Sequence, residues 1–333
     1  MQSASLSPLC RRVLAALAAS LAMAPATAQD SKVWRIGVTK IVTHASLDAA
    51  EKGFEAGLAS AGFKEGANVV YERQNAQGDV ARAEAIAREF KARGVHLVHS
   101  IATPTTQATL KTLGTETPVV FSAITDPVAA GIVPADSAPG RKTGTNVTGV
   151  SDAWPVHLQM QTYARMVPAA KAWGTIYNPN EANSVSHVST MRQAAAKLGL
   201  SLVEVHATSA AQVASAAQSL VGRVQAIAIT SDNTSVAHIE AIAEVCNKHK
   251  IALFAGDVDS VPRGAIAAYG MDYYLIGYAA GKKAALVLRG ARAGDIPWGL
   301  MEQFSLVVNR KAAAMQGVTL SPEILKKADK ILD

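Results

Sequence analysis

Short apolar runs alternate along the chain with longer segments in which apolar residues recur every three or four positions. The runs at 33–38 and 96–102 are typical of buried strands, and the segments at 47–62 and 81–94 are typical of amphipathic helices. Regular alternation of the two patterns predicts βαβ units around a parallel sheet, and therefore the α/β fold class.

The alternation occurs twice in the same order. Equivalent positions, such as Trp34 and Trp173, are separated by about 130 to 140 residues. The sequence therefore predicts two Rossmann-like lobes with parallel sheets. The expected strands are 33–38, 69–76, 96–102, 118–124 and 146–150 in the first half, and 172–178, 200–207, 224–230 and 251–257 in the second.

The chain is expected to change lobes three times, near 149–153, 268–272 and 297–304. Gly149 and Gly270 lie in the first two segments, where glycine permits the dihedral changes of a hinge. The expected boundaries are 33–150 plus about 272–297 for lobe 1, and 151–271 plus about 304–333 for lobe 2.

The first 28 residues differ from the rest of the chain. Arg11 and Arg12 precede an uncharged run at 13–23, and small residues follow at 26–28. This pattern predicts a secretory signal peptide cleaved near Ala28, because the run is shorter than the roughly 20 residues of a membrane span. We expect an exported, periplasmic protein without an anchor, using the ordinary secretory route.

Charge and cysteine content narrow the function further. The formal charge of +6 is spread along the chain without a basic stripe interleaved with aromatic residues, so nucleic acid is not expected as a partner. Only Cys246 remains after removal of the signal peptide, and its helical pattern predicts a buried thiol rather than a disulfide.

Motifs of catalysis are missing from the sequence. It contains no G-x-S-x-G, no H-E-x-x-H, no P-loop and no G-x-G-x-x-G after the first strand, and its histidines are scattered. We therefore expect no enzyme activity, no metal and no cofactor. An exported α/β enzyme stays open as an alternative, because a catalytic triad can assemble in space without a sequence motif.

Polar loops of small residues follow the expected strands, three in each half. Carboxyl ends of parallel strands are where α/β sheets bind ligands, so two facing lobes would form a cleft for a small solute. Each loop taken alone also suits helix capping or a turn. The loops are 39–46, 103–107, 125–127, 178–184, 231–235 and 256–260.

The sequence resembles the tryptophan/tyrosine-type family of ABC transporter substrate-binding proteins over nearly the whole chain after residue 28. The resemblance rests on ordered motifs: IGVTKIVTHASLDAAEKGFEAGL, NAQGD (75–79), IATPTTQA (101–108), FSAITDPVAAGIV (121–133), NVTGVSD (146–152), IYNPNEANSV (176–185), AQSLVG (217–222), SDNT (231–234), AGDVDSVPRGAIAAYGMDYYLIGYAAGKKA (255–284) and VVN (307–309). The first loop departs from its relatives, since Lys40 and residues 43–45 replace a Gln and an acid-Pro pair.

The resemblance implies the type I periplasmic binding protein fold, with two lobes joined by a hinge. It also implies a monomeric, extracytoplasmic solute-binding protein of an ABC importer, which closes on a small solute, often an aromatic amino acid, and delivers it to a membrane permease. A ligand sensor for a membrane receptor would use the same fold, so this alternative stays open.

A zwitterionic amino acid needs an anion site and a cation site. Thr103 as N-cap with Pro104 at the first helical position, together with hydroxyls at 105–106, suits a carboxylate, although simple capping is the alternative. Asp257 is the leading acceptor for the ammonium, with an interlobe or capping role as its alternative. The expected ligand-binding residues are Thr39, Ile41, His44, Thr103, Thr105, Thr106, Ala123, Thr125, Trp154, Tyr177, Asn183, Ser184, Asp232, Asn233, Asp257 and Tyr269.

Several other residues are assigned to structure. Tyr273, Tyr274 and Tyr278 are expected to pack between elements, and Asp126 before Pro127 to form a turn. Asp232 and Asn233 either face the ligand or begin the next helix, since both residue types favour helix starts.

Overall fold

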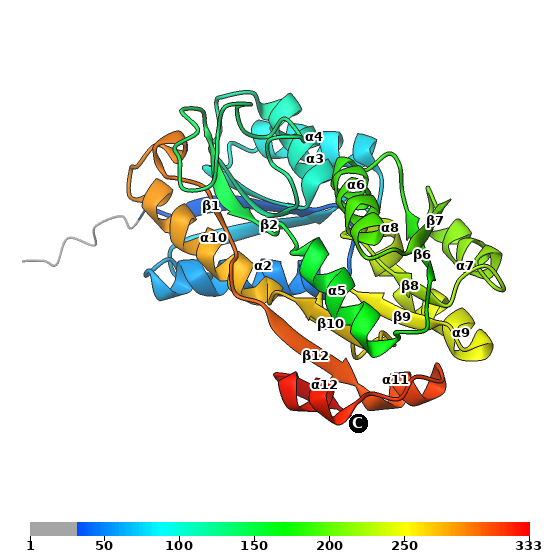
Figure 1. The fold of residues 1–333 in the computed structure, drawn as a ribbon. Helices are drawn as coiled ribbons and strands as arrows, with labels where there is room; N and C mark the ends of the chain where they lie inside the picture. Colours follow the sequence, from blue (N-terminus) through cyan, green and yellow to red (C-terminus); the bar gives the residue numbers. More distant parts are fainter. Residues whose placement is uncertain (1–31) are drawn as a thin grey trace, which may run out of the picture. The chain divides into compact units, whose positions relative to one another are not determined.

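The computed structural model describes residues 32–333, so the expected signal peptide lies outside the described residues. Within that range the chain forms two sheets, each flanked by helices (Figure 1). No helix among residues 32–333 combines the length and apolarity needed to cross a membrane. The prediction of two α/β lobes with parallel sheets is confirmed.

The first sheet is parallel throughout and the second is parallel except at one pairing, where β12 runs antiparallel to β10. In order, the first sheet contains β11 (Gly299–Leu300), β5 (Val147–Ser151), β4 (Val119–Ile124), β3 (Leu97–Ile101), β1 (Trp34–Lys40) and β2 (Val69–Asn75). The second contains β13 (Lys330–Leu332), β12 (Ser305–Asn309), β10 (Ala267–Gly270), β9 (Ala252–Ala255), β8 (Ala226–Ala228), β6 (Ala172–Tyr177) and β7 (Ser201–His206).

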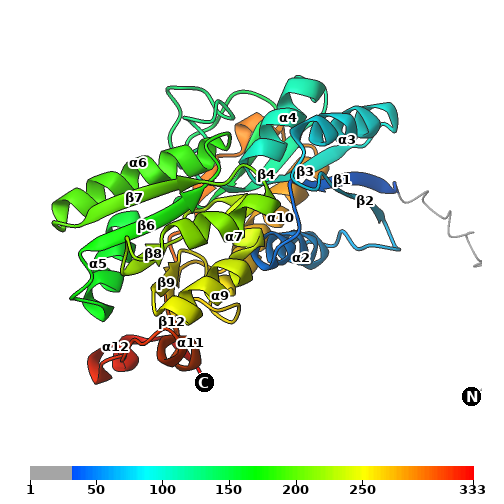
Figure 2. The ribbon, with the colours of Figure 1, turned by 90° about the vertical axis from the view of Figure 1, so that its right-hand side faces the viewer.

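Helices cover both faces of each sheet (Figures 1 and 2). Around the first sheet lie α2 (Ala45–Ser60) and α10 (Tyr273–Leu288) on one face, with α3 (Val80–Ala92) and α4 (Thr103–Leu113) on the other. Around the second lie α5 (Val156–Met166), α6 (Ala182–Lys197), α7 (Ala210–Ser219), α8 (Asn233–Ala237) and α9 (Ile239–His249). The remaining helices are η1 (Val258–Ser260), η2 (Ala293–Asp295), α11 (Arg310–Met315) and α12 (Pro322–Lys327).

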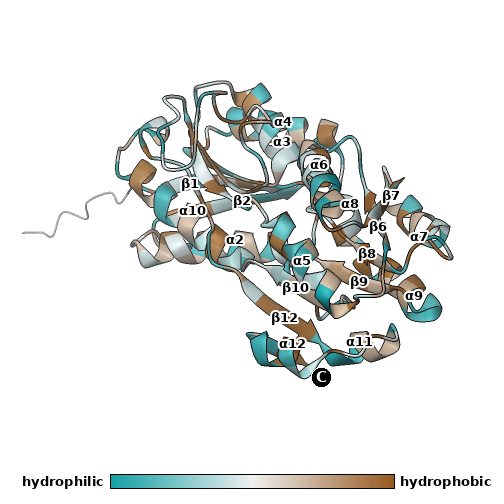
Figure 3. Cartoon of the chain, viewed as in Figure 1, coloured by the Kyte–Doolittle hydropathy of each residue, from teal (hydrophilic) through white to brown (hydrophobic). Residues whose placement is uncertain are grey.

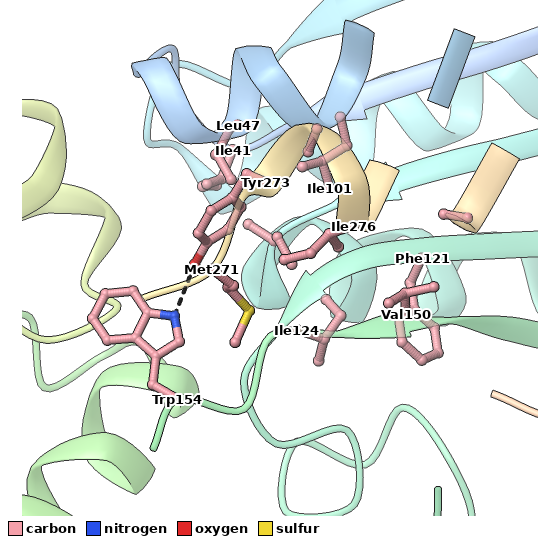
Figure 4. Packing of buried hydrophobic residues seen from close by; sticks show 14 of the residues in the cluster. Ile41, Leu47, Ile101, Phe121, Ile124, Val150, Trp154, Met271, Tyr273 and Ile276 are labelled. Atoms are coloured by element: carbon pink, nitrogen blue, oxygen red, sulfur yellow. Dashed lines mark hydrogen bonds between the residues drawn. The ribbon is translucent and has the colours of Figure 1, made fainter. Parts of the chain in front are cut away.

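The central strands are buried on both faces, which explains their continuous apolar runs (Figure 3). Cys246 is fully buried, as expected. Trp173 is also fully buried, whereas Trp34 near the edge of the first sheet is half-buried. Figure 4 shows part of the apolar core, in which Phe121, Ile124 and Val150 of the first sheet lie near Ile276 of α10.

Helices α2 and α10 pack against each other through glycines. An added Cβ at Gly277 would lie 1.9 Å from the carbonyl oxygen of Ala50, and one at Gly53 would lie 2.0 Å from that of Tyr274. Gly57 and Gly281 are equally close to the facing backbone. The two helices therefore approach at backbone contact, which only residues without a side chain permit.

The chain passes between the two sheets three times: after β5, after β10, and between β11 and β12. Close packing explains the glycines near the first two crossings. A Cβ at Gly149 would lie 2.3 Å from the Phe121 carbonyl oxygen, and one at Gly270 would lie 2.0 Å from the Gly256 carbonyl oxygen. That the crossings act as hinges, with the lobe boundaries given above, stays a prediction.

Candidate functional site

A cavity lies where loops from the carboxyl ends of strands in both sheets meet. We call it the inner cavity. Its walls come from segments that follow seven different strands of the two sheets, as expected for a cleft between α/β lobes. The lining residues are His44, Ser46, Leu47, Ala123, Thr125, Asp152, Trp154, Asn183, Ser231, Asn233, Val236, Asp257 and Tyr273.

The structure brings together part of the site predicted from sequence. The predicted residues that line the inner cavity are His44, Ala123, Thr125, Trp154, Asn183, Asn233 and Asp257. The predicted residues outside its lining are Thr39, Ile41, Thr103, Thr105, Thr106, Tyr177, Ser184, Asp232 and Tyr269. Sequence reasoning missed Ser46, Leu47, Asp152, Ser231, Val236 and Tyr273.

Two of the missed residues had a signal in the sequence. Asp152 directly follows the strand Val147–Ser151, so the rule that selected Asp257 after its strand also applied to Asp152. Tyr273 packs in the core, as its helical spacing predicts, and its hydroxyl also lies in the wall of the cavity.

The predicted carboxylate site at 103–106 has a different local structure from the one expected. Ala102, with a positive φ of 75°, is the N-cap of α4, and Thr103 is already helical. The Thr106 hydroxyl donates back to the Ala102 carbonyl oxygen at 3.0 Å and to the Ser100 hydroxyl at 2.9 Å. The Thr106 hydroxyl is therefore used within its own helix turn.

Other predicted residues lie away from the inner cavity with partners of their own. The Tyr177 hydroxyl donates to Glu204 at 3.1 Å, and the Tyr269 ring packs on Phe304. Asp232 is the N-cap of α8, where it accepts from the Ser235 amide at 2.6 Å. The alternative role for Asp232, at the start of the next helix, is therefore confirmed.

An outer cleft of about 1080 Å³ adjoins the inner cavity and also has walls from both halves of the chain. Ile41 and Pro104 line the outer cleft from the first half, and Asn178 and Glu181 line it from the second. Asn233 lines both spaces, so its side chain lies between the outer cleft and the inner cavity.

Three side-chain hydrogen bonds connect segments of the two halves next to the inner cavity. The Ser46 hydroxyl donates to Asp257 at 2.9 Å, and the Thr125 hydroxyl donates to the Ser231 hydroxyl at 2.9 Å. The Ser186 hydroxyl donates to Asp126 at 3.2 Å. Asp126 also accepts from the Ala129 amide at 2.9 Å, which confirms the expected turn.

Asp257 combines the three roles that its sequence position left open. It lines the inner cavity, accepts from Ser46 of the other half, and caps η1 by accepting from the Ser260 amide at 2.9 Å and hydroxyl at 2.8 Å. Burial raises the pKa of its carboxyl, and the hydrogen bonds from Ser260 and Ser46 oppose that shift.

Asp152, Tyr273 and Trp154 form a chain of hydrogen bonds on another wall. The Trp154 indole N–H donates to the Tyr273 hydroxyl at 3.0 Å (Figure 4), and that hydroxyl donates to Asp152 Oδ2 at 2.5 Å. Asp152 Oδ1 is buried and has no hydrogen-bond partner within residues 32–333. Burial raises the pKa of Asp152 to about 6.

The Trp154 ring is held in place from two further sides. The His187 ring meets it edge-on at 4.8 Å between centroids, and Gly256 lies so close that an added Cβ would be 1.8 Å from two ring atoms. Burial lowers the pKa of His187 to about 3, so this imidazole is neutral at physiological pH. The ring orientation is therefore set by neutral packing as well as by the bond to Tyr273.

The raised pKa values of two buried acids predict a dependence of stability on pH. Asp152 has a pKa of about 6 and Glu181 one of about 7, both above their ordinary values of 3.8 and 4.5. Their contribution to stability is fully present below the ordinary values and is lost as pH rises through 6 to 7. The buried imidazoles of His44, His99 and His187, whose pKa values burial lowers to about 3, act in the opposite direction over the same pH range. The effect of the two acids is therefore measured as a difference between wild type and a variant that lacks them.

The double variant Asp152→Asn with Glu181→Gln should gain stability relative to wild type by about 1 to 3 kcal/mol between pH 5.5 and pH 8, measured as the free energy of unfolding in urea. The contribution of the buried histidines is the same in both proteins and cancels in this difference. A stability difference between variant and wild type that is equal at the two pH values would contradict the prediction.

Comparison with known proteins agrees with the two-lobed architecture. The family model described as ABC transporter substrate binding protein matches residues 35–332. The chain is 35% identical over 291 residues to a tyrosine-binding protein of Clostridioides difficile (strain R20291), covering 86% of this chain and 83% of that protein.

Solved structures show the same similarity. A conserved domain protein from Vibrio cholerae superposes with a TM-score of 0.87 at 36% identity, covering 90% of this chain and 100% of that one. An ABC domain in complex with L-Trp from Streptococcus pneumoniae gives 0.85 at 31% identity, with the same coverage. A ligand-free, open substrate-binding protein from Clostridium difficile gives 0.66 at 31% identity, covering 90% and 99%.

The architecture is the type I periplasmic binding protein fold, and the relatives are solute-binding proteins rather than enzymes. The family match spans nearly all described residues, and a relative above 30% identity covers most of both chains. The chain therefore belongs to the family of ABC transporter substrate-binding proteins.

Proposed function

We propose that this protein captures an aromatic amino acid in the inner cavity and delivers it to the permease of an ABC importer. The observation that carries the proposal is the inner cavity itself, a buried space between two lobes with carboxylates and aromatic rings in its walls. A tyrosine-binding protein and a structure in complex with L-Trp among the relatives support an aromatic amino acid as the solute.

Two carboxylates line the cavity and suit an ammonium group. Asp257 already accepts three hydrogen bonds, whereas Asp152 Oδ1 accepts none although it is buried. A buried acceptor without a partner costs free energy that a ligand donor would recover. The ammonium of the solute therefore binds Asp152 first, with Asp257 as the second negative charge.

The solute carboxylate is assigned to the N-terminus of α2 in place of the segment 103–106. This helix has 16 residues, and its N-cap His44 makes no side-chain capping bond. Ser46 and Leu47 in its first turn line the inner cavity, where backbone N–H groups without a helical partner favour an anion.

The walls of the cavity suit a ring. Trp154 and Tyr273 provide aromatic surface, and Leu47, Ala123 and Val236 provide aliphatic surface. Discrimination among aromatic amino acids then depends on how well the ring fills this space.

We infer that the lobes are in a closed arrangement, which two superpositions support. Two relatives have the same 31% identity to this chain, yet the L-Trp complex superposes with a TM-score of 0.85 and the open, ligand-free protein with 0.66. The bonds Ser46–Asp257 and Thr125–Ser231 are made in this closed arrangement. Opening would proceed by rotation at the three crossings near 149–153, 268–272 and 297–304, with the lobe boundaries given above.

Export completes the proposal. Substrate-binding proteins of ABC transporters work outside the cytoplasm. We infer that residues 1–28 direct this chain to the periplasm as a signal peptide, and that the mature protein works as a monomer that docks on its permease.

Calorimetry with the twenty amino acids tests the function. L-tryptophan or L-tyrosine should bind most tightly, and Asp152→Asn and Asp257→Ala should each weaken binding at least tenfold, about 1.4 kcal/mol, because each removes a negative charge that faces the ammonium. The exposed Asp136→Asn removes the same charge elsewhere and should leave affinity unchanged.

Two results would count against this scheme. If Asp257→Ala binds as tightly as wild type, Asp257 does not contact the solute. If only a solute without an ammonium and carboxylate stabilises the protein, the assignment of an amino acid fails.

A further inference from the structure

Glu181 is a buried carboxylate that lies behind the inner cavity, in the wall of the outer cleft. It is 7% exposed and precedes α6 as its N-cap. Its Oε2 accepts from Asn183 Nδ2 at 3.1 Å, the Asn233 amide at 3.2 Å and Asn233 Nδ2 at 2.5 Å, and its Oε1 accepts from the Thr234 hydroxyl at 3.2 Å. An ionised carboxylate can only accept hydrogen bonds, so the side-chain NH₂ group of each Asn, and not its oxygen, faces Glu181.

The orientation of Asn183 follows from these partners. Its Nδ2 also donates to the Ser231 carbonyl oxygen at 2.7 Å, so both neighbours of the NH₂ group are acceptors. Asn183 is 3% exposed and lines the inner cavity, and its Oδ1 is buried without a hydrogen-bond partner among the described residues. This oxygen is therefore a free acceptor at the cavity wall.

The orientation of Asn233 determines which nitrogen of His44 is an acceptor. Its Nδ2 is held by Glu181, which leaves Oδ1 to accept from an N–H of the buried His44 ring. Burial lowers the pKa of His44 to about 3, so the ring is neutral and one nitrogen is an acceptor. That nitrogen is Nδ1, which is buried and makes no hydrogen bond within the described part of the chain.

We propose that Glu181 is a positioning residue, which orients Asn183, Asn233 and His44 so that this wall of the inner cavity presents acceptors to the solute. The wall then favours groups that donate, such as an ammonium, next to the free Asn183 oxygen. This inference rests on the proposed function, because it assigns the polarity of the amino-acid site. Glu181 itself contacts no solute and acts through the two Asn side chains.

The ionised form of Glu181 is the one that orients the wall. Burial and the neighbouring Asp232 raise the pKa of Glu181 to about 7. The other titratable groups on this side are His238 at the outer cleft and the buried rings of His44 and His187, which stay neutral. A protonated Glu181 must donate one bond, which disturbs the amides, so affinity for an amine falls as pH drops from 8 to 6.

Competition calorimetry with matched ligands tests the proposal on the full-length mature protein. The probes are L-tryptophan with indole-3-propionate, and L-tyrosine with 3-(4-hydroxyphenyl)propionate, in which the second member of each pair lacks the ammonium. Glu181→Gln should weaken the amino acid at least tenfold and leave the analogue within about twofold, since an amide can donate and lets the Asn side chains turn. Glu244→Gln, an exposed change on the same half, is the charge control and should match wild type.

Each outcome decides the inference. Equal weakening of amino acid and analogue would indicate a general structural defect and overturn it, as would an unchanged amino-acid affinity. If Glu181→Gln does not fold, Asn183→Ala takes its place and should lose the same selectivity. If wild type binds neither amino acid, the proposed function fails. If wild type binds an amino acid and Glu181→Gln binds it equally well, only the positioning role of Glu181 fails.

Discussion

Replacing Gly277 by alanine is expected to lower the free energy of unfolding by about 2–4 kcal/mol, although alanine is the better helix former. In an exposed helix this change would stabilise the protein by about 1 kcal/mol. At Gly277 the added Cβ would lie 1.9 Å from the Ala50 carbonyl oxygen, and both atoms belong to backbones that cannot yield separately. Relief requires α10 to move away from α2, which opens the packed core between them.

Urea unfolding followed by circular dichroism measures this effect. Gly299→Ala is the matched control, because nothing lies within 4 Å of its added Cβ, and its stability should stay close to that of wild type. A Gly277→Ala variant as stable as wild type would show that the two helices have room to separate.

Replacing Gly256 by alanine is expected to weaken solute binding more than tenfold, which corresponds to at least about 1.4 kcal/mol. The added Cβ would lie 1.8 Å from two atoms of the Trp154 ring, so the ring must leave its place. Movement of Trp154 removes an aromatic wall of the inner cavity and the indole bond to Tyr273, whose hydroxyl holds Asp152. One methyl group therefore affects both the ring site and the ammonium site.

Calorimetry with L-tryptophan and L-tyrosine measures the loss, and the exposed Asp136→Asn variant again serves as control. Trp154→Phe should lose less affinity than Gly256→Ala, because it keeps an aromatic wall and removes only the indole donor. Wild-type affinity in Gly256→Ala would mean that Trp154 does not form part of the solute site.

Much of the fold could be predicted from sequence, because the hydrophobic pattern is a local property. Apolar runs and helical periods located the central strands and their repetition in two halves. The last four strands, β10 to β13, were missed, since runs of two to five residues carry no recognisable period.

The candidate site was predicted in part. Asp257 and Asn183 were identified because strand ends and helix starts face a cleft in α/β proteins. The segment 103–106 has the same local features, yet its residues do not line the inner cavity. Local chemistry selects candidates, but it does not say which loop end reaches the middle of the cleft.

The sequence by itself determined the α/β class, the two-fold repetition and the set of polar loops from which the site is made, because these follow from the spacing of apolar residues along the chain. Only the tertiary structure decided which residues meet: Tyr273 with Asp152, Gly256 with Trp154, and Glu181 with two Asn side chains. Each pair except Glu181–Asn183 joins residues more than 50 positions apart. Such contacts depend on how the lobes and helices pack, and the spacing of apolar residues along the chain does not determine this packing.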